Sequence, residues 1–184
     1  MIQTWEKIIL DFRQPVACLV PAAIGVGIPV LLYRVIKRKT IRPSVILMLL
    51  YGSVLLQTTF FSREPGTRIG IDLELFGTWG QTYTEHAYFI ENIMMFIPFG
   101  VLAPTIWNRM QSRRWCVFAG FLCSCAIEIS QLLTSRGYGQ LDDVVTNTAG
   151  ALAGWMLWKV CLQSACFRNC CICNRDDRNR RPGA

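Results

Sequence analysis

Hydrophobic residues along this chain fall into long stretches that short polar segments separate. Five of these stretches approach the roughly 20 residues that a helix needs to cross the hydrocarbon core of a bilayer. They cover residues 16–33, 43–61, 87–107, 115–133 and 144–161. The pattern predicts an all-α integral membrane protein, a bundle of about five transmembrane helices.

The first fifteen residues show a different periodicity. Apolar residues recur near helical spacing on one side, and charged residues lie opposite them. The apolar set is Ile2, Trp5, Ile8, Ile9 and Phe12, and the charged set is Glu6, Lys7, Asp11 and Arg13. This arrangement is typical of an amphipathic helix that lies at the membrane surface, so residues 1–15 are predicted to be interfacial.

Polar segments divide the rest of the chain into three parts. Residues 16–42 are expected to form the first transmembrane helix and a basic cytoplasmic connector, and residues 43–161 the main membrane domain. Residues 162–184 are expected to form a cytoplasmic tail rich in Cys and Arg.

Composition agrees with a membrane location. Apolar residues make up 52% of the chain and charged residues 17%, against about 25% in a typical soluble domain. A net charge of +7 could indicate nucleic-acid binding. However, most Lys and Arg residues abut the apolar stretches, so membrane topology explains the charge better, and we expect no nucleic-acid partner.

The basic residues also predict an orientation. Counted from the N-terminus, the successive polar segments hold 2, 5, 2, 3, 1 and 5 of them. The segments rich in Lys and Arg face the cytoplasm by the positive-inside rule, which predicts an outside N-terminus and a cytoplasmic C-terminus. Ten of the twelve acidic residues then lie on or near the outer side. Aromatic residues are expected to form a belt at each membrane surface. Trp107, Trp115 and Trp158 are predicted near the inner surface, and Trp79 and Tyr83 near the outer one.

The nine cysteines raise the question of disulfides or a metal site. On the predicted topology no cysteine lies in an outer loop, so oxidised bridges are not expected. The cluster near the C-terminus lacks paired CxxC spacing and a nearby histidine, which favours reduced thiols over a metal site. That cluster is Cys166, Cys170, Cys171 and Cys173. We expect neither a metal nor another cofactor.

Several polar residues fall inside the predicted spans, where an ionisable group is costly and often marks a function. Ser124, Glu128 and Gln131 share one face of the fourth span, and Gly120 extends that face by one turn. Further polar residues fall at a similar outer depth, namely Glu91, Asn92, Arg136, Asp142, Asp143 and Asn147. Together they predict an outward-facing polar pocket, although helix capping and bonding between helices could also explain them.

Glycines in the fifth span suggest close helix packing. Gly150 and Gly154 form a GxxxG pair, with Asn147 one turn earlier. Such a pair favours close approach of two helices, either within the bundle or between copies of the chain. The oligomeric state therefore stays open.

Three segments resemble sequence motifs of the VanZ-like family. The run from Glu91 to Gly100 resembles the family's N-I-x-x-F-x-P-x-G signature. Ser124, Glu128 and Gln131 resemble its S-x-x-x-E-x-x-Q pattern. Arg136 and the segment 142–150 resemble its R…D-D-x-x-x-N-x-x-G segment. The resemblance covers roughly residues 43–161 and implies a small protein of the bacterial cytoplasmic membrane, associated with reduced susceptibility to the lipid-tailed glycopeptide antibiotic teicoplanin.

Three functional hypotheses follow. A non-enzymatic envelope protein would contact membrane lipids. Its outer pocket would engage a lipid headgroup, teicoplanin or a cell-wall precursor. A membrane enzyme would instead act on a lipid-linked or phosphate-bearing substrate. Glu128, Asp142 and Asp143 would then serve as acid/base groups or hold a hard divalent cation through their oxygens, and Arg136 would clamp an anion. In a scaffold protein the same residues would only hold helices together.

Overall fold

A computed structural model describes residues 2–38, 40–61, 66, 70–72, 82–137 and 139–163. Nearly all of the described residues are helical. The α-helices are α1 (Ile2–Asp11), α2 (Arg13–Lys37), α3 (Pro43–Leu56), α4 (Tyr83–Ile106), α5 (Arg113–Leu133) and α6 (Leu141–Gln163). A π-helical turn, η1 (Gln57–Phe61), follows α3, and a 3₁₀ turn, η2 (Asn108–Gln111), joins α4 to α5. Strand β1 (Ile71–Asp72) pairs in parallel with strand β2 (Gly139–Gln140).

Four segments of the described chain are long and apolar enough to cross a membrane: Gln3–Lys37, Pro43–Phe61, Tyr83–Ile106 and Arg113–Leu133. They contain the first four predicted spans, apart from Trp107 at the end of the third. The expected fifth span is not among them. Helix α6 does form there, but it carries Asp142 and Asp143 in its first turn, Lys159 near its end, and small residues between them.

The N-terminal helices form one apolar stretch with a local break. The turn at Phe12 separates α1 from α2. Pro15 accounts for the break, because it has no N–H to donate to the carbonyl of Asp11, four residues earlier. Helix α2 then continues through Pro21 and Pro29.

Helix α1 packs against α4 instead of lying free at a surface. Its buried residues are Thr4 and Ile8, whereas Trp5 and Ile9 are 51% and 67% exposed. The polar residues Lys7 and Asp11 lie on the partly buried side. Helix α1 therefore faces the protein with a mixed side, on which Ile8 lies beside polar residues, and it turns other apolar residues outward.

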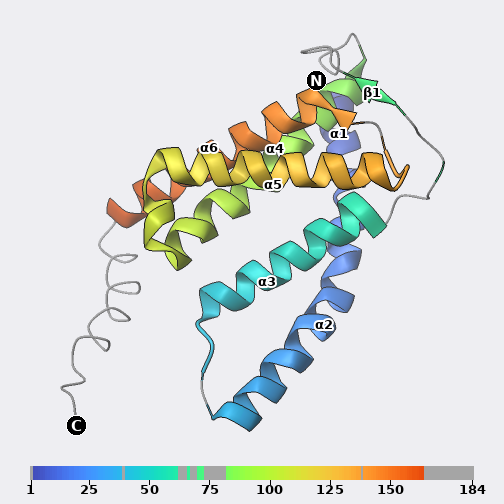
Figure 1. Cartoon of the computed structure of the whole chain (residues 1–184). Coiled ribbons are helices and arrows are strands. Elements are labelled where there is room, and N and C mark those ends of the chain that lie inside the picture. The colour runs from blue at the N-terminus through green and yellow to red at the C-terminus, as the bar shows by residue number, and fades with distance from the viewer. Residues whose placement is uncertain are drawn as a thin grey trace.

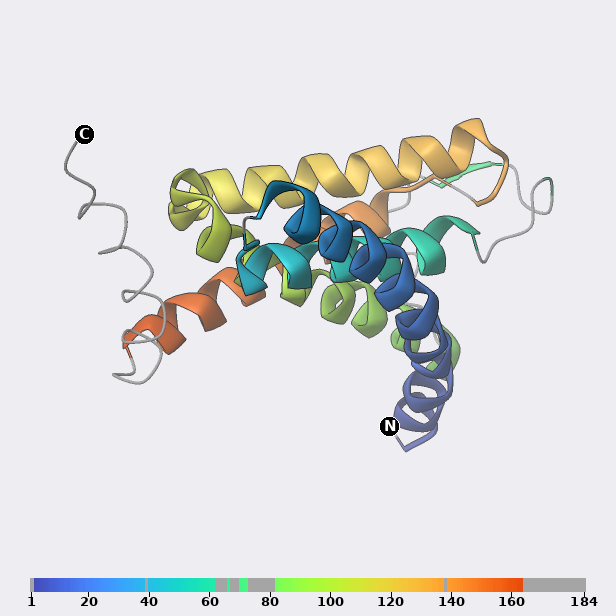
Figure 2. The ribbon, with the colours of Figure 1, turned by 90° about the horizontal axis from the view of Figure 1, so that it is seen from below.

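Helices α4, α5 and α6 lie side by side, with α3 beside them and α2 beyond α3 (Figures 1 and 2). Successive long helices run in opposite directions, so both ends of the bundle receive segments that are distant in the sequence. The pairing of α4 with α6 is the most extensive, and α5 also packs on α6. Tyr51 links α3 to the bundle by donating its hydroxyl to the Met95 carbonyl at 3.1 Å.

Glycines allow α4 and α6 to approach each other closely. A Cβ on Gly154 would collide with the Ile97 carbonyl and lie 2.9 Å from the Cα of Gly100. A Cβ on Gly150 would collide with the Ile93 carbonyl. The GxxxG pair thus faces α4 within the bundle. On α5, a Cβ on Gly120 would lie 2.6 Å from the Cβ of Ala151.

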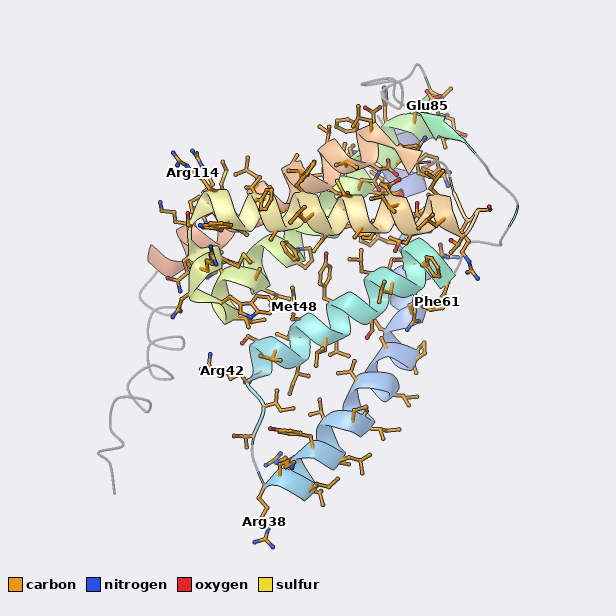
Figure 3. The ribbon with its side chains drawn as sticks, in the orientation of Figure 1. Arg38, Arg42, Met48, Phe61, Glu85 and Arg114 are labelled. Atoms are coloured by element: carbon orange, nitrogen blue, oxygen red, sulfur yellow. The ribbon has the colours of Figure 1, made fainter. Side chains whose placement is uncertain are left out.

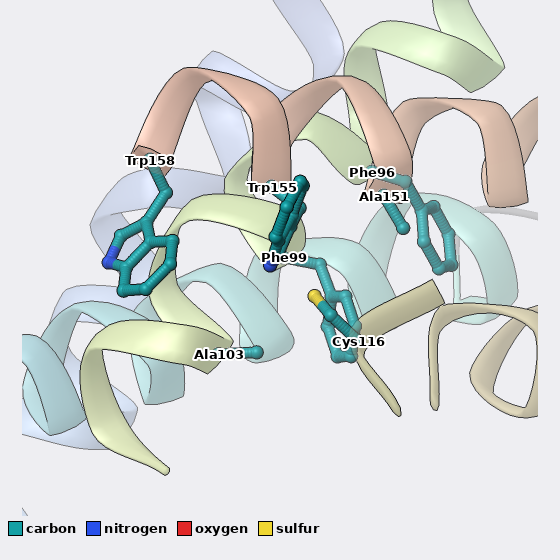
Figure 4. Packing of buried hydrophobic residues seen from close by; sticks show 7 residues of the cluster. All are labelled: Phe96, Phe99, Ala103, Cys116, Ala151, Trp155 and Trp158. Atoms are coloured by element: carbon teal, nitrogen blue, oxygen red, sulfur yellow. The ribbon is translucent and has the colours of Figure 1, made fainter. Parts of the chain in front are cut away.

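Helices α4, α5 and α6 form a three-helix unit, and a compact apolar cluster fills its centre (Figure 4). It consists of Phe96, Phe99, Ala103, Cys116, Ala151, Trp155 and Trp158. Trp158 is 6% exposed, so the expectation that it belongs to an interfacial belt is wrong. Trp107 and Trp115, by contrast, are 48% and 43% exposed.

Charge divides the bundle into two ends (Figure 3). One end, called the basic end below, carries Arg34, Lys37, Arg38, Arg42, Arg109, Arg113, Arg114 and Lys159. The opposite end, called the acidic end, carries Asp11, Glu85, Glu91, Glu128, Asp142 and Asp143. A capping box starts α4 at the acidic end, where Thr82 Oγ1 accepts from the Glu85 N–H and Glu85 Oε2 accepts from the Thr82 N–H.

Replacing Gly154 with Ala is expected to destabilise the protein, because α4 and α6 must move apart to admit the methyl group. Overpacking of this kind typically costs about 1–3 kcal/mol. For a chain of this size each kcal/mol lowers Tm by roughly 2–4 °C. Thermal unfolding of the purified protein in detergent measures the effect. Gly52→Ala is the control, since a Cβ on Gly52 meets nothing within 4 Å. An equal loss of Tm in both variants would contradict the packing argument.

Candidate functional site

Helices α4 and α6 are joined by a polar contact at the acidic end. The Nδ2 group of Asn92 donates to Oδ1 of Asp143 at 2.7 Å. Both side chains are half-buried. The contact lies one to two turns from Gly150, so the close approach of the two helices brings it within hydrogen-bond range.

A second polar contact joins α5 to α6. Nδ2 of Asn147 donates to Oγ of Ser124 at 2.9 Å. Ser124 is fully buried and Asn147 is 3% exposed. Oδ1 of Asn147 is also buried and has no hydrogen-bond partner among the residues that the structure describes. An unsatisfied buried acceptor costs about 1–3 kcal/mol, so it is a feature that needs an explanation.

The loop between α5 and α6 is held by Glu128, whose Oε2 atom accepts from the Gln140 N–H at 3.1 Å. Gln140 belongs to β2, whose pairing with β1 fastens two loops together. Glu128 is 7% exposed and Asp142 is 4% exposed. Thr146 is also buried, and its hydroxyl donates to the Asp142 and Asp143 carbonyls at 2.8 and 3.1 Å.

These contacts define a polar layer at the acidic end of the three-helix unit. Its members are Asn92, Ser124, Glu128, Asp142, Asp143 and Asn147. They were expected to line an outward-facing pocket. The structure places most of them in the helix contacts themselves, where side chains of α4, α5 and α6 meet.

Gln131 and Arg136 reach η1. Nε2 of Gln131 donates to the Thr59 carbonyl at 2.8 Å, and Nη1 of Arg136 donates to the Phe60 carbonyl at 3.0 Å. The Arg136 guanidinium also lies 4.7 Å from the centre of the Phe60 ring. A helix end leaves backbone carbonyls without intrahelical donors, and these two side chains satisfy carbonyls of η1.

Glu91 occupies a separate environment beside α1. It is half-buried, and its Oε1 atom is buried without a hydrogen-bond partner. Lys7 and Asp11 of α1 interact electrostatically with it. Lys7 forms an ion pair with Asp11 at 2.6 Å, and its ammonium lies 5.5 Å from the Tyr88 ring centre. The inward polar side of α1 therefore meets Glu91.

Thr59, Phe60 and Gln140 take part in this region but were not foreseen from the sequence. Thr59 and Phe60 contribute backbone carbonyls and Gln140 contributes a backbone N–H, so side-chain chemistry gave no signal for them. The two adjacent threonines of η1 are a sequence signal for its departure from α-helical hydrogen bonding. Both hydroxyls donate to carbonyls of the preceding turn.

The carboxylates do not form a multidentate metal site. Within the described part of the chain, no group of three or more His, Cys, Asp and Glu side chains is placed to hold a metal ion. The cysteines Cys166, Cys170, Cys171 and Cys173 lie outside the described residues.

The sequence model of the VanZ/LLP1 family matches residues 44–162, which include every member of the polar layer. The chain belongs to the VanZ/LLP1 family. It is thus a membrane protein of that family, in agreement with the resemblance found in its motifs. No curated protein and no solved structure matches it.

The Asn92–Asp143 contact is expected to contribute measurably to stability. Hydrogen bonds between membrane helices average about 0.6 kcal/mol and reach about 1.7 kcal/mol in double-mutant cycles. We expect a coupling in this range between Asn92→Ala and Asp143→Ala, measured by unfolding of the purified protein in detergent. A cycle of Asn92→Ala with Ser124→Ala is the control, because these residues belong to different contacts. Additivity in both cycles would contradict the assignment.

Proposed function

We propose that this protein is a multi-pass protein of the bacterial cytoplasmic membrane that reduces susceptibility to teicoplanin through the polar layer. The layer would engage teicoplanin, a lipid headgroup or a cell-wall precursor at the outer face. The family membership and the layer's concentration of buried polar groups support this proposal. Within a bundle surrounded by lipid, such groups usually serve a function.

The proposal includes α6 as a fifth membrane span. Its inward side carries Asn147, Ala151 and Trp155, which are buried against α4 and α5. Its exposed large hydrophobic residues are Val145, Met156, Leu157 and Val160, and Lys159 near its end is exposed as well. A helix whose polar groups are bonded within the protein needs less overall hydropathy to remain in a bilayer. Five spans, with the basic end in the cytoplasm, give an outside N-terminus and an inside C-terminus.

The observation that carries the proposal is the unsatisfied Oδ1 atom of Asn147. It lies between α5 and α6, in the same layer as Glu128 and Asp143. A donor from a bound molecule would satisfy this acceptor, whereas a purely structural network would be expected to satisfy itself. The acidic side chains around it favour ligands that offer hydroxyl, amide or ammonium groups.

Conservative variants can separate a binding site from a scaffold. Asp143→Asn keeps an oxygen that can accept from Asn92, and Glu128→Gln keeps an oxygen that can accept from the Gln140 N–H. Both substitutions remove a negative charge while they preserve these contacts. A scaffold should therefore tolerate them, whereas a site that depends on charge should not.

We expect Glu128→Gln and Asp143→Asn to lower the inhibitory concentration of teicoplanin to that of a strain without the gene. The comparison uses one bacterial host and matched amounts of protein in the membrane. Glu85→Gln is the matched control, because Glu85 lies at the same end but outside the polar layer, and Gln also serves in a capping box. If the three variants protected as well as the wild type, the proposed function of the polar layer would be rejected.

A further inference from the structure

The connector between α4 and α5, at the opposite end of the bundle, concentrates positive charge. Arg109 lies in η2, and Arg113 and Arg114 begin α5. All three side chains are exposed. No Asp or Glu occurs between residues 92 and 127, a stretch that includes the whole connector. The three guanidinium groups therefore have no acidic neighbour along the chain that would neutralise them.

Aromatic side chains accompany these cations. The Arg109 guanidinium lies 4.0 Å from the ring centre of Trp115, within range of a cation–π interaction. Trp115 packs edge to face on Phe118, at 6.3 Å between ring centres. Trp115, Phe118 and Trp107 are 43%, 50% and 48% exposed. Exposed tryptophans beside arginines are typical of the boundary between hydrocarbon and headgroups.

The connector is also held firmly on the bundle. The indole N–H of Trp155, on α6, donates to the Gln111 carbonyl of η2 at 3.1 Å. The Lys159 ammonium lies 5.1 Å from the centre of the same Trp155 ring, which adds another cation nearby. The backbone of η2 continues from α4 through the bond from the Trp107 N–H to the Ala103 carbonyl, at 2.9 Å. A fixed support reduces the entropy that the site loses when a ligand binds.

We propose that this connector binds the headgroup of an anionic phospholipid. Arg109, Arg113 and Arg114 present planar guanidinium groups, which match the oxygens of a phosphate. Trp107, Trp115 and Phe118 offer apolar surface for the acyl chains of the same molecule. This second element distinguishes a lipid from a free phosphate, which would leave the aromatic surface uncovered. The site is separate from the polar layer and does not depend on the function proposed for it.

Brominated lipids test the proposal, because bromine quenches tryptophan fluorescence only at short range. The full chain, purified in a non-ionic detergent, is titrated with mixed micelles that contain dibrominated phosphatidylglycerol or dibrominated phosphatidylcholine. We expect saturable quenching by phosphatidylglycerol at lower lipid fractions than by phosphatidylcholine. In the triple variant R109Q/R113Q/R114Q, the apparent affinity for phosphatidylglycerol should fall about fivefold for each arginine removed.

The matched control is the triple variant R34Q/K37Q/R38Q, which removes the same charge from the basic end at the exposed terminus of α2. It should keep the preference for phosphatidylglycerol. Equal losses in the two triple variants would indicate diffuse attraction and overturn the proposal. The proposal would also be overturned if soluble glycerophosphate competed with the brominated lipid as strongly as unlabelled phosphatidylglycerol does. The site would then accept any phosphate.

Folding is checked by the elution volume and Tm of each variant. Should the triple variant misfold, the single variants Arg114→Gln and Arg34→Gln provide the same comparison. The proposal is supported if Arg114→Gln weakens the preference for phosphatidylglycerol and Arg34→Gln leaves it unchanged. Equal effects of the two single variants would reject it.

Discussion

The close approach of α4 and α6 is the constraint on which the rest of this structure depends. Gly100, Gly150 and Gly154 remove the side chains that would separate the two backbones. Dispersion contacts then form along the helices, and this packing drives association where lipid offers no hydrophobic advantage. The aromatic cluster around Phe99 and Trp155 fills the space that remains with α5. Helix α6 is rich in small and polar residues, so without this contact little would hold it in the bundle.

The same contact explains why polar side chains are tolerated at the acidic end. Asn92 reaches Asp143, and Ser124 reaches Asn147, only because the helices that carry them are already close. Gln131 and Arg136 extend the arrangement to η1, whose carbonyls they satisfy. The acidic end thus combines residues that hold the helices in place with an acceptor, Asn147 Oδ1, that the protein itself leaves unsatisfied. At the basic end, the Trp115 ring contacts the Arg109 guanidinium of the connector.

Much of this architecture could be predicted from the sequence, because span length and hydropathy are local properties. The limits of α3 with η1 and of α5 agreed within two residues with the predicted spans. Helix α6 was predicted from the apolar stretch 144–161, but that stretch did not show which of its residues face α4. The polar residues were recognised as a group because they fall at a similar depth in the predicted spans. Which of them form the polar layer, which bind carbonyls of η1 and which lie beside α1 depends on the rotation of each helix. Backbone partners such as Gln140 had no side-chain signal.

The docking of α1 on α4 has a consequence for biogenesis. Because synthesis begins at the N-terminus, α1 and α2 emerge long before α4 supplies Tyr88 and Glu91. During that interval Lys7 and Asp11 can neutralise each other, since their ion pair forms within a single helix. The contacts of α1 with α4, such as that of Lys7 with the Tyr88 ring, can form only after α4 has been made. Docking of α1, which is made before α4, would be a late step in assembly, and the burial of Thr4 and Ile8 would mark its completion.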